Sequence, residues 1–510
     1  MACKRVREDA ALDELFLCPA DTKLALIIDE ALDLIARNPD ILKEVERDLD
    51  DHAKAKKLLR VKDKEWAADR TEQLPGMEIE KTEALSKEKL CLNVGRRRMP
   101  AEVVLMFLVI RGYLGSVTDQ KAADQIADSI TLRSYLSGKG MDVPAPRTIL
   151  DNINAVSNST RERVLDLQLY SIGAEGLDDF AMAIIDSTSV KGNSAWPTEP
   201  ELLYKLLGRV FVLGTHLDMF GVTPFRPWSL PRWLRQLDQL AFQINATVGR
   251  SGGRRKRRKL YKHVYRIVEK AVSRLKKEQE YLSAAVESVD LKPSARKRLQ
   301  AVWARIDEGI RHAECVLDCS RRRIEQDEKI PSTEKILSIS DPSVSMIVKG
   351  GREPVLGYKP QIVRTEHGFV SGLIVEQGNI SDSTSLLPAI TQHKERTGVT
   401  PSSVSADDGY ASKAGREGLL EMGVSQVSFS GATGKKVMPD EDWDADEFLA
   451  LRCKRSAVES IMFTLKYVFE FDRMRRQGIE AVRAEMLEKI LAHNFWRMAF
   501  VRRSRRKDAA

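Results

Sequence analysis

The stretch "FAMAIIDSTSVKG", residues 180–192, marks the point at which the chain changes from helical to β character. It is an apolar run rich in β-branched residues, and such a run predicts a buried strand. The strand is expected to end at Asp186, so it carries a carboxylate at its end. We therefore expect a sheet-containing domain to begin here.

The chain before this strand is expected to be helical throughout. Residues 19–95 have the pattern of charged helices, and "TKLALIIDEALDLIAR" has apolar residues at helical spacing before Asn38-Pro39 ends it. From Pro100 the pattern predicts a compact helical unit. Its last helix, after Pro146, could be the recognition helix of a helix-turn-helix that carries Arg147. Helical triplets are common, however, and most do not bind DNA.

After the strand, helices return before the β character does. A long helical stretch runs from about residue 201 to 328, and a hairpin is expected over residues 356–379. The helix that follows has Asp382 or Ser383 as its expected cap. A strand, a helix, another strand and a mostly helical end complete the order. This order predicts an α/β fold, with a mixed sheet and a large helical insertion, preceded by an all-helical N-terminal domain.

The charge of the chain is concentrated in two blocks. The 510 residues have a net charge of +8. Residues 251–330 contain 22 Lys and Arg against 12 Asp and Glu, and residues 451–510 contain 15 against 7. Two basic blocks favour a polyanion such as nucleic acid as partner, although solvated helix faces would have the same composition. The longest apolar run, Val103–Ile110, is too short to span a membrane. No secretory signal or disulfide framework is visible, so we expect a cytoplasmic protein.

Three acidic positions are candidates for chemistry. Asp186 ends the first strand, Asp407 and Asp408 end a later one in "SADDGYAS", and Glu459 lies on a C-terminal helix. Carboxylates at strand ends can converge with one from a helix packed on the sheet. Because successive strand side chains point to opposite faces, Asp407 and Asp408 cannot both enter one site. Alternation alone does not choose between them.

The helix "KRSAVESIMFTLK" provides the most informative context. At helical spacing, Arg455, Glu459 and Lys466 lie on a single helix face. A carboxylate between two cations suits metal-dependent phosphate chemistry, in which Glu459 holds a divalent ion while Arg455 and Lys466 bind phosphate oxygens. The alternative is an ordinary surface pair between Arg455 and Glu459.

This spacing resembles a known signature. R-x3-E-x6-K matches the Y-x2-R-x3-E-x6-K signature of DDE-type insertion-sequence transposases, with Arg452 at the tyrosine position. "IIDSTSV" is similar to the first-strand motif of that family, and "SADDGYAS" to its A-D-x-G-Y/F motif. "ILAHNFWRM" and "RRRMPAEVVLMFLVIRGYLGSVTDQKAADQI" resemble its last helix and its helical N-terminal region. The resemblance covers roughly residues 97–500, and the similar branch has a helical insertion after the first strand.

The resemblance implies an RNase H-like core with two Mg²⁺ or Mn²⁺ ions held by Asp186, Asp407 and Glu459. Asp408 then falls at the variable position of the motif. The implied reaction is hydrolysis of DNA at the inverted repeats of an element, followed by attack of the freed 3′-hydroxyl on target DNA. A homodimer that pairs two DNA ends and a nucleoid-associated, bacterial-type protein are also implied. The basic run within the insertion is expected to clamp the DNA backbone; it comprises Arg254, Arg255, Lys256, Arg257, Arg258 and Lys259.

These expectations define a domain division and two competing functions. The division is residues 1–95, a helical region of unassigned role; 96–175, a helical DNA-binding domain; 176–500, the catalytic domain with its insertion at about 197–330; and 501–510, a basic tail. One competing function is a nuclease or domesticated transposase on the same core. The other is a non-catalytic DNA-binding regulator, against which the three intact acidic positions argue.

Overall fold

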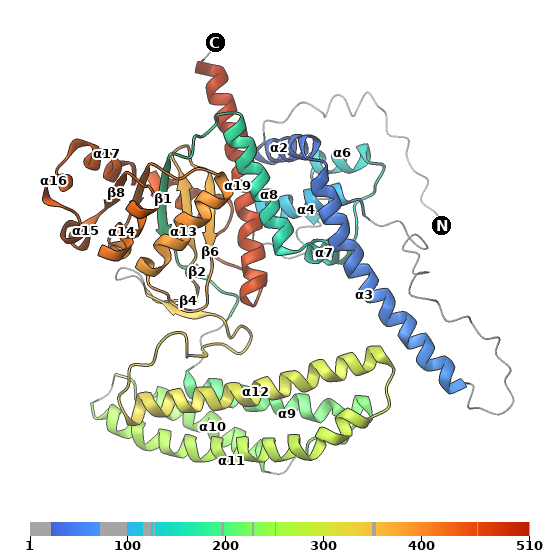
Figure 1. Ribbon diagram of the computed structural model, residues 1–510. Helices are drawn as coiled ribbons and strands as arrows, with labels where there is room; N and C mark the ends of the chain where they lie inside the picture. The colour runs from blue at the N-terminus through green and yellow to red at the C-terminus, as the bar shows by residue number, and fades with distance from the viewer. Residues whose placement is uncertain are drawn as a thin grey trace.

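The computed structural model has a mixed sheet with helices on both faces, a helical N-terminal region and a separate group of long helices (Figure 1). It describes residues 22–71, 99–115, 124–125, 128–194, 198–226, 229–249, 251–348, 353–455 and 457–508. The α/β fold predicted from the sequence, with its helical N-terminal region and large helical insertion, is confirmed. Within the described ranges, no helix is both long enough and apolar enough to cross a membrane.

The N-terminal region consists of helices joined through a shared apolar core. Its described helices are α2 (Lys23–Arg37), α3 (Asp40–Thr71), α4 (Ala101–Leu114), α6 (Ile130–Gly138), α7 (Pro146–Ala155) and α8 (Asn158–Ala174). Thr22 caps α2 by accepting a hydrogen bond from the amide of Ala25 at 3.2 Å. Ser157 caps α8, so the stretch after Pro146 forms two helices. α3 also reaches the insertion, where Asp63 accepts a hydrogen bond from the Ser294 amide at 2.8 Å.

The central sheet has five strands in the order β6-β5-β1-β7-β8. β1 is antiparallel to β5 and parallel to β7, and β8 is parallel to β7. The strands are β1 (Met182–Ser187), β5 (Gln361–Thr365), β6 (Val370–Ile374), β7 (Ser403–Ala406) and β8 (Gln426–Phe429). β5 and β6 form the predicted hairpin, but its expected first residues belong elsewhere. β4 (Val355–Tyr358) pairs with β2 (Val190–Lys191) and β3 (Ser345–Ile347) in a second sheet.

Helices cover both faces of the central sheet. α13 (Asp382–Thr397) and α14 (Lys413–Glu421) pack on one face. α17 (Asp446–Arg455), α18 (Ala457–Val468) and α19 (Ile479–Asp508) contact strands from the other. Shorter elements complete this half of the molecule: η3 (Asp408–Tyr410), α15 (Gly431–Val437) and α16 (Asp440–Trp443). The cap of α13 is Ser381 rather than Asp382 or Ser383, because the helix begins one residue earlier than the pattern indicated.

The insertion leaves after β2 and returns at β3. It contains α9 (Glu199–Thr215), the 3-10 helix η2 (His216–Phe220), α10 (Leu230–Asn245), α11 (Gly253–Ser288) and α12 (Pro293–Glu325). These helices lie apart from the central sheet (Figure 1) and enclose a core of their own, which includes Leu207, Val264 and Ile310. The basic run forms the first turns of α11, which begins just after Gly252 in the left-handed region.

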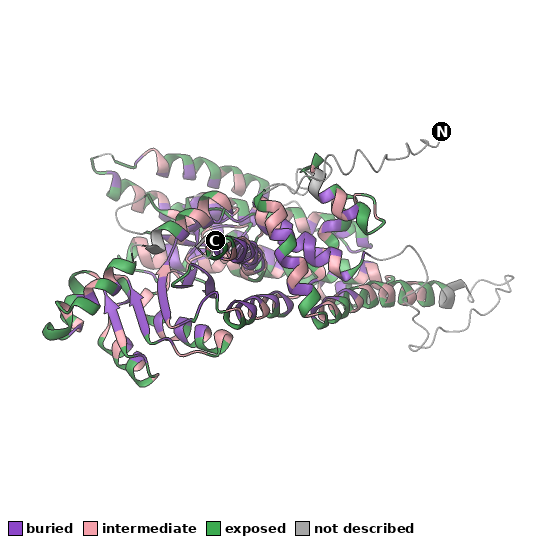
Figure 2. Cartoon of the chain, turned by 90° about the horizontal axis from the view of Figure 1, so that it is seen from above, coloured by how far each residue is buried: buried purple, intermediate pink, exposed green. Residues whose placement is uncertain are grey.

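Helix α19 joins the sheet to the N-terminal helices. Figure 2 shows it end-on between them, and it contacts α2, α4, α8 and β6. The Asn494 side chain forms two 2.9 Å hydrogen bonds to the backbone of Val370, one to N–H and one to C=O. Asn494 thereby fixes α19 to the outer strand of the sheet.

A buried ion cluster joins α19 to α8. Glu488, with 1 % of its side chain exposed, contacts Arg161 at 2.8 Å, Arg476 at 2.7 Å and Arg111 at 3.9 Å. Burial alone raises the pKa of the Glu488 carboxyl, but the three guanidinium groups outweigh it and lower that pKa to about 2. Three guanidinium groups thus share this one buried carboxylate.

We predict that Glu488→Gln lowers the free energy of unfolding at pH 7 by about 3 to 5 kcal/mol, because the buried guanidinium groups lose their counter-charge. The folded-state pKa of about 2 lies below the usual 4.5. The stabilisation is therefore complete above about pH 4.5 and is lost as pH falls toward 2. The variant should lose less stability over this acid range, as urea titrations at a series of pH values would measure.

The matched control is Glu417→Gln on α14, where the side chain is exposed. This change should alter the free energy of unfolding by less than about 0.5 kcal/mol. Identical pH profiles for Glu488→Gln and the unmutated protein would contradict the assignment of the ion cluster.

Candidate active site

Asp186 and Asp407 lie at the carboxyl ends of neighbouring parallel strands. Ile185 of β1 is paired with Ala406 of β7, and each aspartate is the next residue of its chain. Because parallel strands run in the same direction, their next residues meet at the same edge of the sheet. The structure thus brings together two predicted site residues that are far apart in the sequence.

Strand alternation places Asp186 on the face toward α17. Side chains alternate between the two faces of a strand. Ile185 packs in the core with α13 and α14, whereas Ile184 packs against Leu451 of α17. Asp186 follows the parity of Ile184, so it belongs to the α17 face.

Asp407 has the same parity. Ser405 donates a hydrogen bond to the carbonyl of Leu451 on α17 at 3.4 Å, while Ala406 packs on the opposite side with α13. Asp407 therefore follows Ser405. Glu459 lies on α18, which contacts β1, but its side chain is outside the described part of the structure. The backbone thus carries all three acidic positions on elements that meet at one side of the sheet.

The two adjacent aspartates have separate partners. Asp408 accepts hydrogen bonds from the amides of Thr433 at 2.7 Å and Gly434 at 3.0 Å, which lie in α15. These bonds, the Gly434 amide first, lower the pKa of Asp408. Asp407 instead accepts from the Asp408 amide at 2.6 Å and the Ser430 hydroxyl at 3.4 Å. Asp408 is committed to α15, which leaves Asp407 as the candidate ligand.

A series of hydrogen-bonded side chains lies near Asp186 and Asp407. The buried Tyr410 hydroxyl donates to the side-chain carbonyl of Gln361, and the amide of Gln361 donates to Asp382 at 3.0 Å. Lys359 pairs with the same Asp382 carboxylate at 2.9 Å. Burial, with the nearby charges of Asp382, Asp186 and Asp407, raises the pKa of Tyr410. The tyrosine hydroxyl therefore remains protonated and acts as a donor close to the site.

Sequence reasoning did not identify these side chains as part of the site. Asp382 was expected only as a helix cap, and Lys359 and Gln361 were placed in a hairpin. Tyr410 stood inside the quoted "SADDGYAS" stretch, but nothing local indicated its partner. One signal in the sequence could have indicated a polar role: Gln361 is a polar residue at the start of the predicted strand. In the structure its side chain is buried at the start of β5.

The expected cation pair is divided between two helices. Arg455 is the last residue of α17 and Lys466 lies in α18, with residue 456 outside the described part. A single helix face through Arg455, Glu459 and Lys466 therefore stays a prediction. At the tyrosine position of the signature, the Arg452 guanidinium lies over the Trp443 ring at 5.0 Å.

The other predicted DNA-binding residues lie away from the aspartates. Arg147 is exposed at the start of α7, and the basic run lies in the insertion on α11. Arg254 and Arg258 pair with Asp327, and Arg257 donates to the Thr247 carbonyl at 3.2 Å. The members whose side chains are most open to solvent are Arg254, Arg255, Lys256 and Lys259.

The described donors fit a hard divalent ion. Asp186 and Asp407 both offer carboxylate oxygens, the ligand type that Mg²⁺ and Mn²⁺ prefer. Among the described residues, no group of three His, Cys, Asp or Glu side chains is placed to hold a metal. The side chain of Glu459, the third expected ligand, is not among them.

The comparison with protein families supports the resemblance. Residues 348–495 match the model of the transposase DDE domain. The match includes Asp407 and Glu459 and begins well after Asp186. No curated protein and no solved structure gave a match. The match supports the resemblance to DDE-type transposases that the motifs indicated.

We predict that Tyr410→Phe costs about 1 to 3 kcal/mol in free energy of unfolding, because the buried side-chain carbonyl of Gln361 loses its donor. Chemical denaturation measures this loss. Tyr170→Phe is the matched control, since that side chain is 70 % exposed, and it should change stability little. Equal effects of the two substitutions would show that the hydrogen bond from Tyr410 to Gln361 does not stabilise the fold.

Proposed function

We propose that the protein is an active DNA transposase that cleaves the ends of an element and joins them to target DNA. The observation that carries this proposal is the β1–β7 register, which aligns Asp186 with Asp407 on the face contacted by α18. The match to the transposase DDE domain supports the class of reaction.

In this proposal Asp186, Asp407 and Glu459 hold two divalent ions, Mg²⁺ or Mn²⁺. Bound there, the ions would polarise a phosphodiester and lower the pKa of a water molecule. Arg455 and Lys466 would hold the phosphate oxygens in line for attack. Tyr410, through Gln361 and Asp382, would keep the strand ends that carry the aspartates in register.

Two displacements at phosphorus would follow each other. In the first, water oxygen bonds to phosphorus, the bond to the 3′ oxygen breaks, and a 3′-hydroxyl is released. In the second, that hydroxyl loses its proton and attacks a target phosphodiester, whose own 3′ oxygen leaves. The second step conserves the number of phosphodiester bonds and needs no external energy source.

DNA recognition would fall to elements outside the sheet. We assign element-end binding to the N-terminal helices, including α7 with Arg147, and backbone binding to the basic run of α11. A homodimer would pair two ends, and the protein would act in the cytoplasm on nucleoid DNA. The division at residues 95, 175 and 500 is part of the same proposal. A nuclease that cleaves without joining is the second candidate, favoured by the same aspartate pair.

We predict that Asp407→Asn reduces metal-dependent cleavage of inverted-repeat DNA by at least about 10³-fold, because a metal ligand is lost while the size of the side chain is kept. DNA affinity should change less than about threefold. Gel-based cleavage and fluorescence-anisotropy binding assays measure the two quantities.

Asp408→Asn is the matched control, because Asp408 bonds to α15 and not toward the site. It should retain cleavage within about tenfold, with some loss of stability. Full cleavage by Asp407→Asn would refute the site. Cleavage without strand joining by the unmutated protein would favour the nuclease.

We also predict that the double change Arg255→Gln and Lys256→Gln lowers the salt slope of DNA binding by about 2, because two phosphate contacts are lost. Lys276→Gln with Lys277→Gln, two exposed residues farther along α11, is the matched control. Anisotropy titrations over a salt series would compare them. Equal slopes for both double variants would remove the basic run from the DNA-binding surface.

A further inference from the structure

Helix α3 has a buried first part and an exposed second part. Its first turns place Ile41, Val45 and Leu49 in the core that the N-terminal helices share. Over the described residues 50–67 of the same helix, no side chain is buried. We call this stretch the arm. At 1.5 Å per residue, Asp63 stands about 21 Å along the helix from Leu49, the last core residue of α3.

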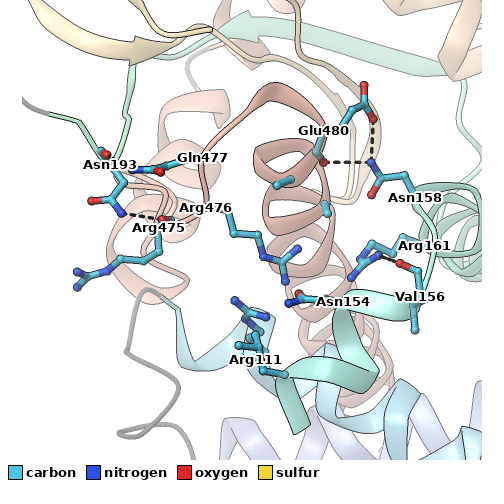
Figure 3. Close-up of a pocket in the computed structure, with 13 residues that line it drawn as sticks. Arg111, Asn154, Val156, Asn158, Arg161, Asn193, Arg475, Arg476, Gln477 and Glu480 are labelled. Carbon is cyan, nitrogen blue, oxygen red and sulfur yellow. Dashed lines mark hydrogen bonds between the residues drawn. The ribbon is translucent and has the colours of Figure 1, made fainter. Parts of the chain in front are cut away.

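The first part of α3 is fixed to the N-terminal helices. Asp48 accepts a hydrogen bond from the Ser157 amide at the start of α8, at 2.8 Å. α8 is in turn fixed to the end of α7, because the Arg161 side chain donates to the Val156 carbonyl. Figure 3 shows this bond beside a pocket that α7, α8 and the start of α19 line. The arm therefore projects from a firm base.

The tip of the arm reaches the turn between α11 and α12. Asp63 accepts a hydrogen bond from the Ser294 amide at 2.8 Å. α12 begins at Pro293, so this amide belongs to the first turn, where helix amides have no partner within the helix. Lys292, the residue before α12, has no acceptor in its side chain. A carboxylate from a distant helix thus caps α12.

A second polar contact lies next to this cap. The Trp66 indole N–H donates to the Asp290 carboxylate at 3.3 Å. The hydroxyl and the amide of Ser294 lower the pKa of Asp63, and the charge of the nearby Lys292 lowers it further. Asp63 is therefore ionised at neutral pH, the form that the positive end of the α12 dipole favours.

The opposite end of the insertion is attached to the half of the molecule that carries the central sheet. In the segment after α12, the Ile339 carbonyl accepts from Arg209 of α9 at 3.1 Å. The Ser332 hydroxyl accepts from the Asn379 amide, between β6 and α13, at 3.1 Å. This attachment and the tip of α3 lie at opposite ends of α12 (Figure 1), whose 33 residues rise about 50 Å.

The length of α12 makes the orientation of the insertion depend on its far end. The long helices enclose a core of their own, so they can move as one body. A rotation of about 10° at the attached end would displace the far end by about 9 Å, given a rod about 50 Å long. Such a displacement exceeds the reach of the hydrogen bonds of Asp63 and Trp66. These contacts are polar and partly open to solvent, so water can replace them when they break.

We infer that the arm of α3 is a releasable strap that fixes the orientation of the insertion, with Asp63 as its contact residue on α12. When the strap is closed, the far end of the insertion is held to the N-terminal helices. When it is released, the insertion turns about its attachment at residues 332–339. The basic run lies at the attached end, where Arg254 and Arg258 pair with Asp327, so it moves least. The inference is independent of the proposed function, because it concerns contacts within the chain.

The test compares amide hydrogen exchange in Asp63→Ala and Asp63→Asn, both in the full chain. Asp63→Ala removes the acceptor while favouring the helical state of α3, so a loss of protection reports the contact with α12. Exchange should become at least about fivefold faster in residues 54–67 and in residues 289–299, and stay unchanged in the buried α4. Asp63→Asn should change exchange less than about twofold, because an asparagine oxygen also caps helices.

Cross-linking of lysines measures the orientation of the insertion. Lys64 and Lys292 are exposed and lie next to Asp63 and to the first turn of α12. A short amine-reactive reagent should join them in the unmutated protein and in Asp63→Asn, and at least about fivefold less in Asp63→Ala. Glu65→Ala removes an exposed carboxylate from the same arm and is the matched control, with exchange and cross-linking unchanged. Equal circular dichroism spectra would establish that every variant is folded.

Each contrary result has a distinct meaning. Unchanged exchange in Asp63→Ala would remove Asp63 from the contact. Equal losses of protection in Asp63→Ala and Glu65→Ala would attribute the effect to the charge of the arm and overturn the strap. Full cross-linking of Lys64 to Lys292 in Asp63→Ala would show a permanent joint and overturn the release. Exchange of the arm as slow as that of α4 in the unmutated protein would do the same. All of these results would leave the transposase proposal standing.

Discussion

The parallel pairing of β1 with β7 is the constraint on which the candidate site depends. These strands are separated by the whole insertion and by the β5–β6 hairpin, yet their register places Asp186 beside Asp407. A slip of one residue would turn one aspartate to the opposite face, toward α13. The chain tolerates an insertion of this size because the long helices bury their apolar residues among themselves and leave the central sheet unaltered. The backbone hydrogen bonds between β1 and β7 thus determine the relative positions of the two candidate site residues.

Charge in this molecule is arranged on both sides of that pairing. The buried Glu488 contacts three guanidinium groups, and one of them, that of Arg161, also donates to the Ile153 carbonyl of α7. A basic region lies on α11 in the insertion. Asp186 and Asp407 lie at the same edge of the central sheet. This pattern suits a polyanion that must approach carboxylates, since cations along its path offset the repulsion before the metal ions do.

Much of the fold could be predicted from the sequence, because its signals were local. The apolar run that ends at Asp186 and the alternating segments after residue 356 indicated strands, and glycines and prolines marked the helix ends. Non-local choices could not be predicted. β4 was assigned to the hairpin, although it pairs with two other short strands, β2 of two residues and β3 of three. Asp186 and Asp407 were predicted as site residues from their strand-end contexts, and the β1–β7 register brings these two positions together. Gln361 and Asp382 were missed because their role depends on tertiary contacts with Tyr410.

The position of α19 has a consequence for how the chain is made. This helix follows every other described element, and the apolar faces of α2, α4 and α8 are buried against it. While the ribosome is still producing the earlier parts, those faces have no partner, and α7 is not yet backed by its finished core. The N-terminal helices can therefore take up their final packing only after α19 has emerged. The packing of the N-terminal helices would thus be completed after the strands of the central sheet have been made.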